Sequence, residues 1–350
     1  MIPEFYRDWH IGLQLLVLSI FLAVGVIFLV KFCDLFVTSS SAIAKKLHIA
    51  PMIIGLTVVA MGTSCPELAV SVSDSIASLI SGGYANISIG NVVGSNICNI
   101  LLVLGLSILF TPIIVKKSSM KKEFPVLLFV SFLLTIFVLV FGSVTGNYVI
   151  TRWMGIVFVI LEIAYVVFLV IDAKKHPVEA DPNEIKDMKL WKAVLFVIIG
   201  AIGIAAGGEF VVFGAKGIAI AGADAIGINH NLAESLVGLT IVAVGTSLPE
   251  LVTSVVAARK GENDIALGNV IGSNIFNILF VLGVSATINP LVTGKEIVVD
   301  IITMMSVTSL LFLVSLNKKL DRKIGIIFLL IYVLYLTYLI LRTLGIIPQM

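Results

Sequence analysis

The chain of 350 residues is 59% hydrophobic and only 13% charged, whereas soluble globular domains are typically about 25% charged. This composition excludes a soluble globule and predicts a polytopic membrane protein. The formal net charge of +2 is too small to supply the basic surface that binds nucleic acid.

Ten apolar segments are each long enough to cross a bilayer as a helix, which takes about 20 residues. The first segment is too long for the core of a signal peptide, so we expect it to be retained as a helix. We predict an all-α polytopic fold of ten transmembrane helices near residues 11–38, 51–80, 86–111, 124–142, 149–171, 191–219, 234–258, 264–288, 296–316 and 323–345.

The longest polar stretch of the chain, residues 172–190, divides the ten segments into two sets of five. We interpret this stretch as a solvated linker because it contains no apolar segment long enough to form part of a core. The predicted units are a first five-helix repeat over residues 1–172, a linker over 173–190 and a second five-helix repeat over 191–350.

The distribution of positive charge predicts the orientation in the membrane. Because five is an odd number, the second unit must enter the bilayer from the opposite side to the first, so the two units are expected to be inverted. Of the 23 Lys and Arg residues, 17 lie in loops that would share one face of the membrane, and 5 lie on the other face. The positive-inside rule places the first face in the cytoplasm. We therefore expect a multi-pass plasma-membrane protein with a cytoplasmic linker and both termini extracellular.

Two sequence motifs occur once in each unit. Residues 55–71 (GLTVVAMGTSCPELAVS) and 238–254 (GLTIVAVGTSLPELVTS) are identical at 12 of 17 positions. Residues 89–105 and 267–283 are identical at 13 of 17 positions. A repeat that holds an ionisable residue at membrane depth beside Gly and Pro is typical of the ion site of a transporter.

Each copy of the first motif places a carboxylate next to a helix break. Pro66 and Pro249 lack the N–H that would bond the carbonyl four residues earlier, so a kink or break is predicted at each proline. Glu67 and Glu250 follow directly. An acidic group at the centre of a membrane helix costs very roughly 3 kcal/mol, so two of them in equivalent places favour a functional site over a packing feature.

Other oxygen-bearing side chains accompany the glutamates. Thr and Ser precede each glutamate, and Asn, Ser and Asn recur every four residues in the second motif, which places them along one helix face. Oxygen ligands suit calcium and sodium better than zinc or copper. Asn at this spacing is by itself also common at packed helix contacts. These side chains are Thr63, Ser64, Asn91, Ser95 and Asn99, and then Thr246, Ser247, Asn269, Ser273 and Asn277.

Two further acidic residues and the cysteines have simpler explanations. Asp34 and Glu209 occupy equivalent places in the first and sixth helices, where they could reach the interface or pair with Lys31 and Lys216. The three cysteines fit no metal or redox spacing, so we interpret them as buried small side chains.

The segments GTSCPEL and GTSLPEL, followed by GNVVGSNICNI and GNVIGSNIFNI, resemble the two alpha repeats of the sodium/calcium exchangers, within the calcium:cation antiporter superfamily. The alpha-1 motif covers about residues 55–105 and the alpha-2 motif about 238–283. The resemblance implies inverted repeats in which helices 2, 3, 7 and 8 surround the ions while helices 1 and 6 move across them. It also implies the metal ligands Ala60 (backbone), Thr63, Ser64, Glu67, Ser95, Asn99, Ala243 (backbone), Thr246, Ser247, Glu250, Ser273 and Asn277.

One of these positions departs from part of the family. Asn277 stands where some prokaryotic exchangers and the potassium-dependent branch have Asp. We therefore do not expect potassium dependence. The linker of about 20 residues is also too short to hold a regulatory domain like that of the animal exchangers.

The resemblance implies a secondary active antiporter that exchanges sodium for calcium by alternating access, with no cofactor and no catalytic residue. Calcium/proton antiport is the alternative within the same superfamily, and the sequence also leaves open a cation channel. An intramembrane hydrolase is disfavoured because Ser64 and Ser247 have no histidine available at membrane depth. The expected partners are calcium, sodium and the lipid bilayer, with no obligatory protein partner.

Overall fold

The structure is a computed structural model that describes residues 11–85, 87–144, 147–177, 188–225 and 243–347. Within these ranges, eight helices are long and apolar enough to cross a membrane, and a ninth crossing is made by a pair of helices bent by 48°. The chain is predominantly helical, as predicted. The segment predicted over 234–258 is described only from residue 243 onward.

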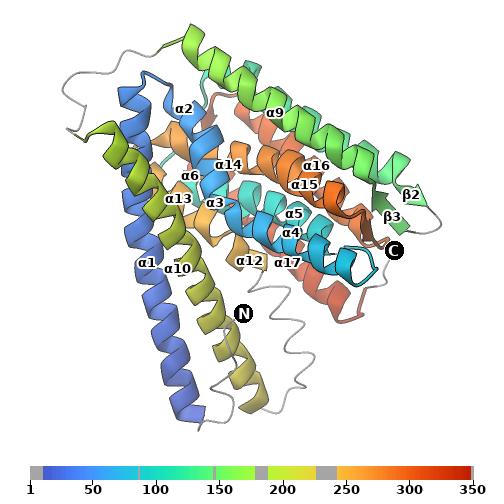
Figure 1. Cartoon of the computed structure of the whole chain (residues 1–350). Coiled ribbons are helices and arrows are strands. Elements are labelled where there is room, and N and C mark those ends of the chain that lie inside the picture. Colours follow the sequence, from blue (N-terminus) through green and yellow to red (C-terminus); the bar gives the residue numbers. More distant parts are fainter. Residues whose placement is uncertain (1–10, 86, 145–146, 178–187, 226–242, 348–350) are drawn as a thin grey trace.

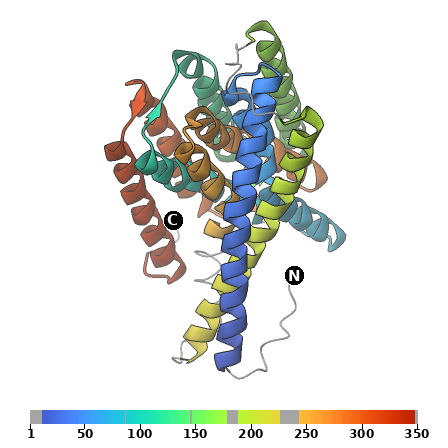
Figure 2. The ribbon, with the colours of Figure 1, turned by 90° about the vertical axis from the view of Figure 1, so that its left-hand side faces the viewer.

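The two longest helices are α1 (Ile11–Lys46) and α10 (Leu190–Ala225), each of 36 residues. They lie side by side and extend beyond the rest of the bundle, as Figure 1 and the rotated view in Figure 2 show. Both run further than the predicted ends at residues 38 and 219. Lys45 and Lys46 in the last turn of α1 complement the negative end of the helix dipole, which favours the longer helix.

Glycines allow the backbones of α1 and α10 to approach closely. A Cβ atom added to Gly214 would lie 2.6 Å from the Leu18 carbonyl oxygen, and one added to Gly25 would lie 2.7 Å from the Val211 nitrogen. Side chains larger than hydrogen would therefore separate the two helices. Small residues at the contact are the usual means of packing helices tightly in a membrane.

The crossing that is bent by 48° contains the GTSCPE motif. It begins with α2 (Pro51–Ile54), continues through the π-helical turn η1 (Gly55–Val59) and α3 (Ala60–Thr63), and resumes after a break as α4 (Cys65–Ile80). The break falls at Ser64, where φ is −85° and ψ is 8°. Because Pro66 in the first turn of α4 cannot donate to a carbonyl in the preceding turn, the ladder of helical hydrogen bonds stops there.

The same break occurs in the second half of the chain. There α12 (Ala243–Thr246) is followed by α13 (Leu248–Arg259), and Ser247 between them has φ −87° and ψ 4°. Ser64 and Ser247 thus adopt the same backbone conformation. The predicted break beside each proline is confirmed.

The two most buried crossings each contain a π-helical turn. One consists of α5 (Ile87–Cys98), η2 (Asn99–Leu104) and α6 (Gly105–Phe110), and the other consists of α14 (Asn263–Phe276), η6 (Asn277–Val281) and α15 (Leu282–Ile288). Each π-helical turn begins at an asparagine that the sequence singled out. Turns of this kind are frequent at functional sites because they change which residues share a helix face.

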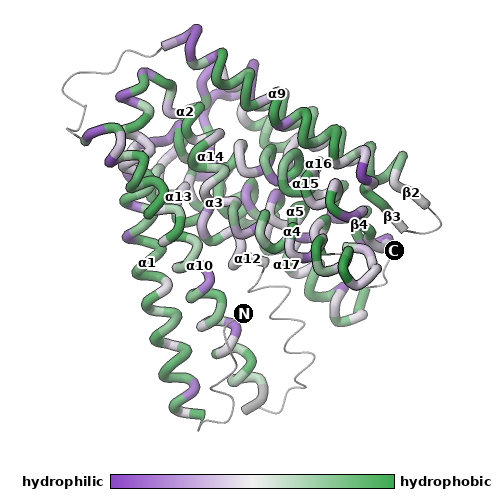
Figure 3. The backbone as a smooth tube through the Cα atoms, in the orientation of Figure 1, coloured by the Kyte–Doolittle hydropathy of each residue, from purple (hydrophilic) through white to green (hydrophobic). Residues whose placement is uncertain are grey.

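The remaining helices form the outer layer. They are α7 (Lys117–Lys121), α8 (Glu123–Ile136) with the π-helical turn η3 (Phe137–Phe141), α9 (Arg152–Lys175), α16 (Ile297–Ser315) and α17 (Arg322–Thr343). Large apolar side chains are exposed along them, such as Ile160 at 59% and Leu334 at 69%. The hydropathy colouring in Figure 3 shows apolar residues along the lengths of α1 and α9. Such surfaces suit a bilayer, which would cover them.

Short strands, which the sequence did not predict, connect the helix ends. The strand β1 (Ile113–Ile114) pairs antiparallel with β5 (Lys319–Leu320), and β3 (Asn147–Ile150) pairs on its two sides with β2 (Ser143–Val144) and β4 (Leu291–Thr293). The helix predicted to start at 149 therefore starts at Arg152, because residues 147–150 form a strand.

Candidate ion-binding site

The two repeated glutamates lie at the centre of the bundle. Glu67 is in the first turn of α4 and Glu250 is in the first turn of α13, and both are 0% exposed. Each carboxylate lies in the first turn of the helix that follows a break. The helix break thus brings two negative charges together in the interior.

Hydroxyl groups surround the glutamates. Ser64 donates a hydrogen bond of 2.7 Å to Oε1 of Glu250, which belongs to the other half of the chain. Ser95 and Ser273 donate more weakly, to Oε1 of Glu67 at 3.4 Å and of Glu250 at 3.5 Å. Thr246 also hydrogen-bonds to the Glu67 carboxylate. Thr63 likewise hydrogen-bonds to the Glu250 carboxylate, so five of the predicted hydroxyl ligands contact a glutamate.

The two predicted backbone ligands, Ala60 and Ala243, each begin a short helix. The Thr63 hydroxyl is 3.3 Å from the carbonyl oxygen of Ala60 and 3.1 Å from Oδ1 of Asn269. Ser247 is buried at the second break. Ala243 begins α12, so its backbone occupies the place that Ala60 has at the start of α3. The structure therefore arranges both predicted backbone positions one helical turn before the breaks.

Asparagines from the two halves exchange hydrogen bonds. The side-chain amide of Asn96 donates to the Asn274 carbonyl at 3.2 Å, and that of Asn274 donates to the Asn96 carbonyl at 3.3 Å. Asn99 then donates to Oδ1 of Asn274 at 3.1 Å, and Asn277 donates to Oδ1 of Asn96 at 3.2 Å. These bonds fix the orientation of the Asn99 and Asn277 side chains.

The sequence did not single out Asn96 or Asn274. The available signal was their recurrence in the repeated GSN triplets. Conversely, the four-residue spacing placed Asn91 and Asn269 beside the ligands, and only Asn269 contacts the site: its Oδ1 accepts from Thr63 at 3.1 Å and its amide donates to the Glu250 carbonyl at 3.5 Å. The Asn91 amide donates to Ser71 at 3.3 Å and the Asn269 amide donates to Ser254 at 2.9 Å.

Four buried carboxylate and amide oxygens in this cluster, and the Ser247 hydroxyl as well, have no hydrogen-bond partner among the residues that the structure describes. Each half supplies one carboxylate and one amide oxygen to this set. We call Glu67 Oε2, Glu250 Oε2, Asn99 Oδ1 and Asn277 Oδ1 the four unpaired oxygens. Leaving a buried polar oxygen without a partner is costly, so the carboxylate oxygens need a proton or a cation and the amide oxygens need a hydrogen-bond donor or a cation. None of the ion pairs among the described residues includes either glutamate.

The donor atoms of the cluster are of the kind that suits hard cations. Its donors are carboxylate, hydroxyl and amide oxygens, which suit sodium and calcium.

Cys33 and Cys98 are buried as predicted, but Cys65 is exposed because the first turn of α4 directs it away from the core. Among the described residues, no group of three or more His, Cys, Asp or Glu side chains could hold a metal ion.

Comparison with known proteins identifies the family. The sequence profile described as "Sodium/calcium exchanger protein" matches residues 17–171 and 192–341. The chain belongs to the sodium/calcium exchanger family. The two matched segments of this exchanger flank the polar stretch between its halves.

Relatives of the exchanger match along most of its length. The putative antiporter CaxA of Alkalimonas amylolytica is 38% identical over 332 residues, which cover 92% of this chain and 98% of CaxA. The sodium/calcium exchanger MaX1 of Methanosarcina acetivorans is 33% identical, and the match covers 91% of this chain and 97% of MaX1. By contrast, human sodium/potassium/calcium exchanger 4 matches only 33% of this chain.

The fold is also that of a solved exchanger. The structure of the sodium-calcium exchanger NCX_Mj soaked with sodium and strontium superposes with a TM-score of 0.75 and 34% sequence identity. The match covers 92% of this chain and 98% of NCX_Mj.

Proposed function

We propose that this protein is a secondary active antiporter that exchanges sodium for calcium across the membrane by alternating access. The observation that carries the proposal is the pair of buried glutamates, each with an unpaired oxygen and each contacted by hydroxyls. Membership of the sodium/calcium exchanger family and the names of its relatives support the choice of ions.

The proposed ligand set combines both halves. Glu67 and Glu250 supply the negative charge that balances a divalent cation, and hydroxyl, amide and carbonyl oxygens supply the remaining coordination. The set is Ala60 (carbonyl), Thr63, Ser64, Glu67, Ser95 and Asn99 from the first half, with Ala243 (carbonyl), Thr246, Ser247, Glu250, Ser273 and Asn277 from the second.

Competition for the same oxygens couples the two fluxes. Calcium takes 6–8 oxygen ligands, so a bound calcium ion engages most of this set. Sodium ions that use the two glutamates cannot be bound at the same time as calcium. Each time the binding site changes the side of the membrane to which it is open, it carries either calcium or sodium. This is the requirement for exchange.

We further propose that the chain forms ten transmembrane helices in two inverted repeats, with residues 1–172 and 191–350 as the repeats and 173–190 as a cytoplasmic linker. The matching breaks at Ser64 and Ser247 and the matching π-helical turns support this arrangement. The positive-inside rule supports extracellular termini in the plasma membrane. The long pair α1 and α10 is the candidate for the moving part.

The decisive experiment is uptake of calcium-45 into proteoliposomes that contain the purified protein. An outwardly directed sodium gradient should drive uptake, and a proton gradient of the same size should not. Uptake driven by protons alone would favour calcium/proton antiport. Calcium flux that does not depend on the opposing ion would indicate a channel. The double variant Glu67→Gln with Glu250→Gln is the negative control.

A further inference from the structure

A lysine at the end of α13 ties α1 to the core. Lys260 Nζ lies 2.7 Å from Oδ1 of Asp34, and it donates to the Asp34 carbonyl at 3.1 Å and to the Thr38 hydroxyl at 2.5 Å. The sequence suggested that Asp34 reaches the interface or pairs with Lys31, and in the structure it contacts a residue 226 positions away in the chain. One cation therefore holds both the backbone and two side chains of α1.

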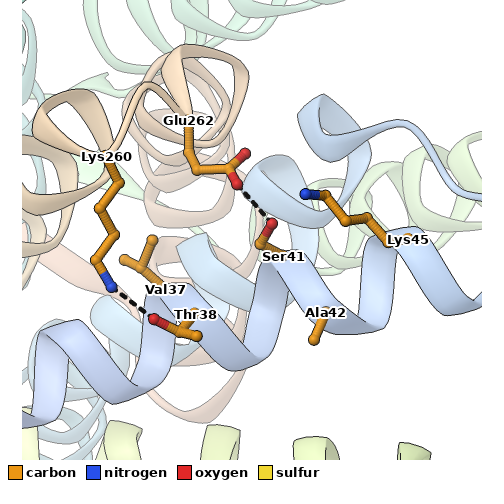
Figure 4. Close-up of a pocket in the computed structure, with 7 residues that line it drawn as sticks. All are labelled: Val37, Thr38, Ser41, Ala42, Lys45, Lys260 and Glu262. Carbon is orange, nitrogen blue, oxygen red and sulfur yellow. Dashed lines mark hydrogen bonds between the residues drawn. The ribbon is translucent and has the colours of Figure 1, made fainter. Parts of the chain in front are cut away.

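A second contact lies one turn further along α1. Ser41 donates a hydrogen bond of 2.6 Å to Oε1 of Glu262, and Figure 4 shows the two contacts on either side of the same pocket. The pocket has a volume of about 330 Å³ and is also lined by Lys45. Gly261, with φ +79°, forms the turn that directs Lys260 and Glu262 toward α1.

The turn that makes these contacts is firmly attached to the ion-binding helices. It joins α13, which carries Glu250, to α14, which leads to Asn277, and α14 is almost wholly buried. Asp264 in the first turn of α14 forms an ion pair of 2.5 Å with Lys116. A contact between this turn and α1 is therefore a contact between the core and the proposed moving helix.

The other half of the chain keeps an acidic residue, Glu209, in the place of Asp34, but it lacks the other residues of the contact. In the sequence repeat, Thr38 corresponds to Phe213 and Ser41 corresponds to Lys216 of α10. The turn that follows α4, residues 81–84, contains no charged residue, whereas the turn after α13 has Lys260 and Glu262. Among the residues that the structure describes, this polar contact is therefore made by α1 and not by α10, although the glutamate is duplicated.

We propose that Lys260 and Glu262 form a one-sided latch that holds α1 against the core in one access state and so makes the two access states unequal in free energy. The proposal rests on the proposed alternating-access function. Lys260 and Glu262 act on transport through the position of α1 and touch no ion. A contact present in one state only shifts the population toward that state.

The test measures the position of α1 in the full-length protein in nanodiscs. Spin labels are placed at Leu47, directly after α1, and at Leu316, at the end of α16, which are 47% and 54% exposed. The three native cysteines are replaced by alanine. Double electron–electron resonance then measures the distance between the two labels. This distance reports where the end of α1 lies relative to the outer layer, and the measurement needs no ion gradient.

Lys260→Met removes the charge and the hydrogen bonds, and it should change the ratio of the two distance populations by about two- to fivefold, the range that partly exposed ion pairs support. Glu262→Gln should shift the ratio in the same direction. Lys260→Arg keeps a cation at this position and should resemble the wild type. Lys319→Met, at an exposed lysine of β5, is the matched control for loss of a positive charge.

A wild-type distance distribution in Lys260→Met would overturn the latch, as would an equal shift in Lys319→Met or in Lys260→Arg. These results are separate from the proposed function, because the distances do not depend on which ion drives transport. Absence of sodium-driven calcium uptake in the wild-type protein would refute the proposed function, whatever the distances show.

Discussion

Ser64 donates a 2.7 Å hydrogen bond to Glu250 across the boundary between the two halves of the chain. The serine belongs to the helix break of the first half and the carboxylate to the first turn after the break of the second. Neither half therefore contains a complete set of partners for its own glutamate. The two breaks must be held in register for the site to exist.

Neutralising either glutamate should abolish calcium exchange. Glu67→Gln and Glu250→Gln keep the shape of the side chain but remove one of the two negative charges that balance calcium. We expect the apparent calcium affinity to fall by at least about 10- to 100-fold, the loss typical of altered metal-site partners. Sodium-driven calcium-45 uptake measures the effect, with Glu296→Gln outside the site as control. Wild-type uptake by either variant would show that these carboxylates do not bind calcium.

Asn277→Asp should change the cation preference without unfolding the protein. The Asn277 amide donates to Oδ1 of Asn96 at 3.2 Å, and an aspartate there would instead place two acceptors against each other. The added carboxylate needs a cation or a proton, so sodium dependence, proton dependence or calcium affinity should shift. Uptake at several sodium concentrations and pH values measures this. Asn99→Asp is the matched variant in the other half, and unchanged transport in both would remove these amides from the proposed ligand set.

Replacing Asn96 should destabilise the contact between the halves. Asn96→Ala removes its bond to the Asn274 carbonyl and leaves the Asn277 amide without its acceptor. Losing buried hydrogen bonds of this kind costs about 1–3 kcal/mol. Thermal unfolding in detergent should therefore occur at a lower temperature. A double-mutant cycle with Asn274→Ala should give non-additive losses, and simple additivity would contradict the coupling.

Enlarging a glycine in α10 should separate it from α1. A side chain at Gly214 would meet the Leu18 carbonyl, so Gly214→Leu should lower thermal stability and slow exchange. Gly222 lies in the same helix with nothing within 4 Å of an added Cβ atom, which makes Gly222→Leu the control. Equal effects of the two substitutions would show that close packing at Gly214 does not matter.

The proposed orientation can be tested by labelling cysteines from each side of intact cells. A cysteine at Asn183, in the predicted cytoplasmic linker, should react only after the membrane is permeabilised. A cysteine at Leu344, which is 39% exposed and follows α17, should react from outside. The reverse pattern would invert the proposed topology.

Features that depend on local sequence could be predicted, and features that depend on the relative placement of the halves could not. The breaks at Ser64 and Ser247 follow from prolines two residues later, a purely local cause. The pairing of Asp34 with Lys260 joins residues far apart in the chain, so spacing along one helix could not predict it. Hydrophobic periodicity did not predict β3 either. Its four residues are too few to distinguish a strand from the first turn of a helix.

The exchange between Asn96 and Asn274 has the form of the contact across a symmetric dimer, in which each partner gives what it receives. Such an interface contains every contact twice, so one copy can change while the other preserves the pairing. Among the described residues, the contact of Lys260 with α1 has no equivalent at α10. Fusing two equal units in a single chain thus permits a resting preference for one side of the membrane, which a dimer of identical units in strict symmetry could not have.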